Sequence, residues 1–77
     1  MYKAYLYVED QGDGSSSIVT FDEEITEDFL DTVGSYYLDS FRDGDGITLK
    51  KVLTFPSKQE ALDCGLAPQS LEDYFSG

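Results

Sequence analysis

The chain has 77 residues, of which 16 are acidic and 5 are basic, and its formal net charge is -11. A chain of this length forms one small domain, residues 1–77, which buries only about 60–65% of its unfolded surface and has little interior for an enclosed active site. The absence of histidine excludes serine–histidine and cysteine–histidine catalytic pairs, and the sequence contains neither a CxxC motif nor a glycine-rich phosphate loop. We therefore expect a protein that is not an enzyme and has no cofactor.

The net charge is concentrated in one part of the chain. Residues 9–45 contain 12 of the 16 acidic residues and one basic residue, Arg42, whereas the other residues contain four of each sign. A charge excess usually serves solubility, and in some chains it accompanies disorder. Disorder is disfavoured here because 40% of the residues are apolar and 14% are aromatic, with periodic spacing.

The sequence also indicates a compartment. Cys64 is the single cysteine, which excludes an intramolecular disulfide, favours a reducing environment and predicts a buried, small apolar side chain. The sequence contains no signal-peptide pattern and no run of 18 apolar residues. We expect a protein of the cytoplasm that does not associate with membranes and is a monomer or a homodimer.

The N-terminal segment predicts a β-hairpin. Residues 2–9 alternate in polarity with the period of two that is typical of a half-buried strand. The expected core face consists of Ala4, Leu6 and Val8. Tyr5 and Tyr7 fall on the second face, where we expect partial exposure. A turn over residues 10–16 and a returning strand over residues 17–21 complete the hairpin.

Residues 21–41 are expected to contain a central amphipathic helix. Thr26 is a suitable N-cap residue, and Ile25 and Leu30 have the spacing of a hydrophobic staple. Apolar residues then gather on one side of the helix and acidic residues on the other. Gly34 costs roughly 1 kcal/mol in a helix interior. The alternative to one continuous helix is therefore a break at this glycine.

Residues 47–55 predict a long strand at the centre of the sheet. Its apolar face is expected to consist of Ile47, Leu49, Leu53 and Phe55. Ser57 and Glu60 form a capping-box pattern that opens a short helix, and Gly65 ends it.

A last helical turn is expected over residues 70–75, which can dock on the sheet through Leu71, Tyr74 and Phe75. The complete pattern predicts an α+β fold in the order ββαβα. It consists of a small, mostly antiparallel three-stranded sheet with a central amphipathic helix and a short C-terminal helix.

Two acidic, glycine-containing turns, residues 10–14 and 42–46, resemble fragments of calcium-binding loops. An EF-hand loop requires an acidic residue at its first position and a glutamate at its twelfth, around a glycine at the sixth. Neither turn meets this requirement, whereas aspartate and glycine are common in tight turns for conformational reasons. We therefore expect no dedicated metal site, although weak surface binding of divalent cations stays open.

Acidic residues occur around the central helix in more places than helix stability explains. Glu27 and Asp28 lie in the first turn, where the helix dipole favours negative charge, but Asp43 lies at the opposite, unfavourable end. We therefore predict a partner-binding face in which Tyr36 and Leu38 are apolar anchors among carboxylates. The predicted binding residues are Glu24, Glu27, Asp28, Asp31, Tyr36, Leu38, Asp39, Asp43 and Asp45.

In composition and layout, Asp22 to Asp31 and Tyr36 to Gly46 resemble the small acidic inhibitors encoded by phages and mobile elements, including anti-CRISPR proteins and other DNA mimics. The resemblance implies a protein without a cofactor that acts in the cytoplasm of a bacterial host cell and blocks nucleic-acid access to a bacterial nuclease or CRISPR effector complex. The implied partner presents a Lys/Arg-rich groove, and direct binding to nucleic acid is not expected. Arg42 departs from this pattern, because local pairing with Asp39 or Asp43 would dilute the mimicry. The alternative is a small acidic phage adaptor or structural protein that binds an ordinary protein partner.

Overall fold

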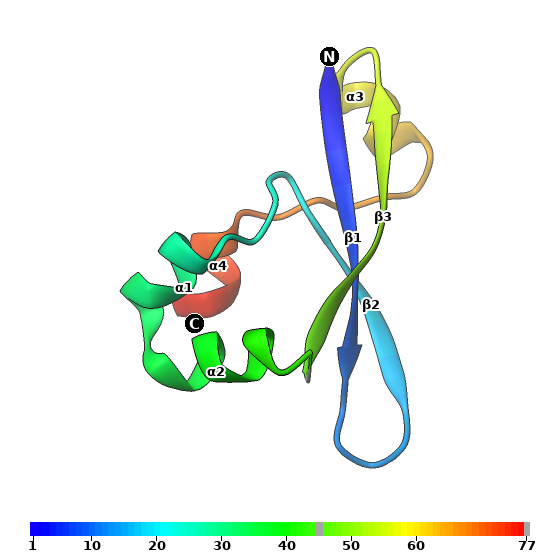
Figure 1. Cartoon of the computed structure of the whole chain (residues 1–77). Helices are drawn as coiled ribbons and strands as arrows, with labels where there is room; N and C mark the ends of the chain where they lie inside the picture. The colour runs from blue at the N-terminus through cyan, green and yellow to red at the C-terminus, as the bar shows by residue number, and fades with distance from the viewer. Residues whose placement is uncertain (45, 77) are drawn as a thin grey trace.

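The computed structural model describes residues 1–44 and 46–76 (Figure 1). Over these residues the chain forms a three-stranded antiparallel sheet and four helices, which confirms the predicted α+β fold. The elements are β1 (Tyr2–Asp10), β2 (Ser16–Phe21), α1 (Glu27–Val33), α2 (Ser35–Arg42), β3 (Ile47–Phe55), α3 (Lys58–Asp63) and α4 (Leu71–Ser76).

The central strand of the sheet is β1, since the strand order is β2-β1-β3. The prediction that residues 47–55 form the central strand is therefore wrong, and β3 lies at an edge with most of its residues exposed. The burial of β1 explains its position, because Ala4 and Leu6 on one face and Tyr7 on the other are all buried. A strand that is buried on both faces is suited to the middle of a sheet.

A register shift in β3 divides its apolar residues between the two faces. Leu6 pairs with Lys51 and Tyr7 pairs with Leu49, so Lys50 is an extra residue in the β3 strand. Residues opposite each other in an antiparallel pair point to the same face. Leu49 therefore shares the face of Tyr7, whereas Leu53, which pairs with Ala4, shares the opposite face. The predicted single apolar face of this strand is wrong, because one inserted residue reverses the alternation.

The main core lies between the sheet and the helices α1, α2 and α4, which are on the same side of the sheet in Figure 1. Tyr7 is only 1% exposed, and its hydroxyl accepts a hydrogen bond from the Ile25 N–H at 2.9 Å. Burial raises the pKa of this hydroxyl, and the bond from Ile25 partly opposes the increase. The predicted exposure of Tyr7 is therefore wrong, whereas Tyr5 is half-buried. The buried core residues are Tyr7, Phe21, Ile25, Leu30, Leu38 and Leu71.

The C-terminal turn docks as predicted. Leu71 is buried, and the rings of Tyr74 and Phe75 lie 5.2 and 6.3 Å from the ring of Phe21. The Ser70 hydroxyl accepts a hydrogen bond from the Asp73 N–H at 3.1 Å, which caps the start of α4. The aromatic residues of this short helix thus complete the core over β2.

Helix α3 packs at the other end of the sheet, where it contacts β1 and β3. Ala61 and Ala4 are both fully buried there. Ser57 is the N-cap residue, but its side chain makes no capping hydrogen bond, so the predicted capping box is not formed. Cys64 at the end of α3 is exposed, contrary to the prediction of a buried thiol. This short helix buries only the narrow side that carries Ala61, and the Cys64 side chain does not lie on that side.

The predicted central helix is interrupted at Gly34. The prediction of one continuous helix is therefore wrong, and the alternative, a break at this glycine, is confirmed. Its start is as predicted, because the Thr26 hydroxyl accepts a hydrogen bond from the Phe29 N–H at 3.2 Å and both Ile25 and Leu30 are buried. Gly34 ends α1 and begins α2, with φ of 147° and ψ of 151°. This backbone conformation is essentially restricted to glycine. It lets α2 turn back against α1, so that both helices contribute to the core.

Gly34→Asn is expected to destabilise the protein by about 1–3 kcal/mol, because an asparagine side chain strains this backbone conformation. The matched control is Gly44→Asn, since φ at Gly44 is 75° and asparagine tolerates the left-handed region. A Cβ atom at either glycine would meet no atom within 4 Å, so the comparison isolates the backbone. Urea unfolding measures the difference. Equal losses for the two variants would contradict a special role for Gly34.

Candidate functional site

The acidic residues before and along α1 and α2 are all exposed where the structure describes them. We call this set the acidic surface. It consists of Asp22, Glu23, Glu24, Glu27, Asp28, Asp31, Asp39 and Asp43. It includes every predicted acidic binding residue except Asp45, which lies outside the described residues. The Tyr36 side chain also lies outside the part of the chain that the structure describes.

The predicted anchor Leu38 is not on this surface. Its side chain is 8% exposed and belongs to the core with Leu30 and Tyr7. The prediction assumed one continuous helix, in which Leu38 falls among the acidic residues. The break at Gly34 begins a separate helix, α2, and Leu38 belongs to the core instead. Leu38 is therefore not an exposed anchor on the acidic surface.

Arg42 pairs with a different residue from those expected. Its Nε atom donates a hydrogen bond to Glu27 Oε1 at 3.1 Å, which links the end of α2 to the start of α1. Within residues 1–44 and 46–76 this is the one salt bridge. Both side chains are exposed, so the pair contributes at most about 1 kcal/mol to stability. Its main effect on the acidic surface is to neutralise Glu27 and leave the other carboxylates uncompensated.

The lysines lie on other elements than the acidic surface. All four are exposed and belong to β1, β3 and α3, and none lies on α1 or α2. They are Lys3, Lys50, Lys51 and Lys58. In Figure 1, α2 lies near the start of β3, whereas α3 lies near the end of that strand.

Repulsion within the acidic surface predicts that salt stabilises the protein. Raising NaCl from low to physiological concentration shortens the screening length to about 8 Å and weakens repulsion between exposed carboxylates. We expect a gain of about 1 kcal/mol, which corresponds to about 4–8 °C in Tm for a domain of this size. Thermal unfolding followed by circular dichroism measures it. A Tm that stays constant or falls would mean that these carboxylates are individually compensated.

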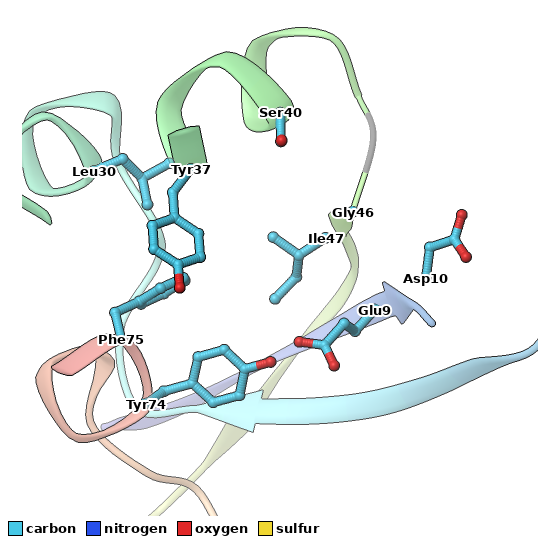
Figure 2. A pocket seen from close by; sticks show the side chains of 9 residues that line it. All are labelled: Glu9, Asp10, Leu30, Tyr37, Ser40, Gly46, Ile47, Tyr74 and Phe75. Atoms are coloured by element: carbon cyan, nitrogen blue, oxygen red, sulfur yellow. The ribbon is translucent and has the colours of Figure 1, made fainter. Parts of the chain in front are cut away.

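A pocket that the sequence analysis did not predict opens beside the acidic surface (Figure 2). It has a volume of about 330 Å³ and lies where α2, α4, the end of β1 and the start of β3 meet. Aromatic side chains of Tyr37, Tyr74 and Phe75 line one part of it, and Glu9 and Asp10 line another. The pattern in residues 70–75 predicted that α4 docks on the sheet. That pattern did not indicate that residues of α4 and Glu9 would line the same pocket.

Comparison with known proteins identifies no relative. No protein-family model, curated protein or solved structure matches the chain. What can be inferred about function comes from the chain's own charges, cavities and buried groups.

The acidic turn between β1 and β2 uses its carboxylates to hold the loop. Asp10 Oδ1 accepts a hydrogen bond from the Gly12 N–H, and Asp13 Oδ1 accepts from both the N–H and the hydroxyl of Ser15. The bonds from Ser15 lower the pKa of Asp13. Among the described residues, no three carboxylate or thiol groups gather in a way that could hold a metal ion. These aspartates therefore have a structural role in the turn.

The four helices of the described residues are all short. Within the described residues, none is both long enough and apolar enough to cross a membrane. The longest, α2, has 8 residues, whereas a membrane-spanning helix needs about 20.

Proposed function

We propose that this protein is an inhibitor that binds a basic, nucleic-acid-binding surface on a bacterial nuclease or CRISPR effector complex and blocks access of the nucleic acid. The observation that carries the proposal is the acidic surface, a set of eight exposed carboxylates. The one basic residue on the same helices, Arg42, is already paired with Glu27. The proposed activity needs no catalytic group and no cofactor. It requires only that the protein occupies the surface.

The spacing of the carboxylates supports this proposal. About one helical turn separates Asp28 from Asp31 and Asp39 from Asp43, so the residues of each pair are about 5–6 Å apart along the helix axis. This distance is of the same order as the phosphate spacing along a nucleic-acid strand. A groove of lysine and arginine side chains that binds phosphates can therefore accept these carboxylates. Nucleic acid itself is repelled by the same charges.

A second candidate function, a small acidic adaptor that binds an ordinary protein partner, is favoured by a different observation. Leu49 and Val52 on the edge strand β3 are 43% and 41% exposed. Apolar side chains at an open sheet edge are suited to a protein contact. Binding through this edge would persist at high salt, whereas binding through the acidic surface would weaken as salt rises.

The deciding experiment is competition. A partner is captured from a bacterial lysate by the tagged protein, with and without added DNA, and is then loaded with fluorescently labelled nucleic acid. We expect the protein to displace the labelled nucleic acid, and we expect its own binding to weaken steeply with NaCl. A partner that binds the protein and its nucleic acid together, each with unchanged affinity, would rule out the inhibitor and favour the adaptor.

A further inference from the structure

The pocket between α2 and α4 combines two kinds of wall. One is aromatic, because the Phe75 ring lies 5.1 Å from the Tyr37 ring and 5.0 Å from the Tyr74 ring, both in edge-to-face contact. Phe75 also contacts Phe21 in the core at 6.3 Å, which fixes the group to the sheet. The aromatic wall is therefore formed before any ligand binds, and binding would not have to order it.

The other wall is acidic. In Figure 2 the Glu9 carboxylate lies across the pocket from Tyr37 and Phe75, near the hydroxyl end of Tyr74. Glu9 is half-buried, and its Oε1 accepts a hydrogen bond from Gln11 Nε2 at 2.9 Å. One such bond leaves most of the carboxylate's acceptor positions available. Asp10 lies farther out at the same side, and none of the described residues that line the pocket is a lysine or an arginine.

We propose that this pocket binds an arginine side chain of the partner protein. The inference rests on the proposed function, because that function requires a partner with exposed basic residues. A guanidinium group is planar, is attracted to aromatic faces and pairs with carboxylates, so it matches both walls. The methylene groups of the arginine would pack on Ile47, which lines the side next to Glu9.

Size and charge both favour a side chain as the occupant. The volume of about 330 Å³ is at the lower end of the range for small-molecule sites, which suits a single long side chain. Glu9 and Asp10 repel phosphate groups, so a nucleotide is disfavoured. The pocket would supply a specific contact beside the acidic surface, whose charges alone attract any basic surface.

The test is an NMR titration of the intact protein with a capped pentapeptide that has one arginine between glycines. We expect saturable shifts of the Tyr37 and Tyr74 ring signals. A lysine peptide should bind more weakly, and the neutral citrulline peptide should not bind at the pocket. Equal binding of the citrulline peptide, or shifts that never saturate, would overturn the proposal. Tighter binding of spermidine at the same site would also overturn it, in favour of a free polyamine.

Variants locate the interaction. Glu9→Gln is expected to weaken the arginine peptide by about tenfold, and Tyr37→Leu by about fivefold. The matched control is Glu23→Gln, which removes the same charge from an exposed loop and should change affinity by less than about twofold. Equal effects of Glu9→Gln and Glu23→Gln would mean that only general attraction is measured.

The experiments can contradict the proposed arginine pocket and the proposed inhibition separately. If the peptide does not bind while nucleic acid is still displaced from the partner, the pocket inference alone is wrong. If the peptide binds at the pocket but the partner keeps its nucleic acid, the proposed inhibition is wrong.

Discussion

Reversal of two acidic residues, Asp31→Lys together with Asp39→Lys, is expected to abolish displacement of nucleic acid from the partner. Each reversal removes an attraction to the basic groove and adds a repulsion, so the pair should weaken binding on the order of 100-fold. Both residues are exposed on α1 and α2, so the free energy of unfolding should change by only about 0.5 kcal/mol. The competition assay measures binding, and thermal unfolding verifies the fold.

The matched control reverses Glu60 and Asp63 on α3, which changes the net charge by the same amount at an exposed site away from the acidic surface. We expect this variant to retain most of its ability to displace nucleic acid. If the control loses as much of its ability to displace nucleic acid as the Asp31 and Asp39 variant, overall charge governs binding and the acidic surface has no special role.

Phe21→Ala is expected to cause the largest loss of stability, about 3–5 kcal/mol. The side chain is fully buried, and its ring contacts those of Tyr7 and Tyr74 at 5.6 and 5.2 Å as well as that of Phe75. Truncation would leave a cavity between the sheet and α4. Since domains have only about 5–15 kcal/mol of stability in total, the variant should be close to unfolding at room temperature.

Phe29→Ala is the comparison for this prediction. Phe29 is half-buried and contacts the Phe75 ring at 5.8 Å at the margin of the core. In urea unfolding, the loss of stability caused by Phe29→Ala should be clearly smaller than that caused by Phe21→Ala. If the two losses were equal, or if Phe21→Ala were harmless, the core would not be centred on Phe21.

The sequence alone determined that the acidic surface exists. Five basic residues cannot pair with 16 acidic ones, and an unpaired buried charge is very costly, so any stable fold must leave most carboxylates in water. The features that depend on neighbouring residues were also predictable. The Thr26 cap and the docking turn from Leu71 to Phe75 involve residues at most four positions apart, so local spacing specifies them.

The tertiary structure decided where these elements lie relative to one another. Alternation predicted strands but not their order, since pairing partners are distant in the sequence, and the extra residue Lys50 reversed the faces of β3. The break at Gly34 costs little in propensity and is compensated by packing, which no local pattern reports. Because of this break, the Leu38 side chain lies in the core and not among the acidic residues. The pocket has the same origin, because Glu9 and Tyr74 meet only when β1, β3 and α4 have all packed.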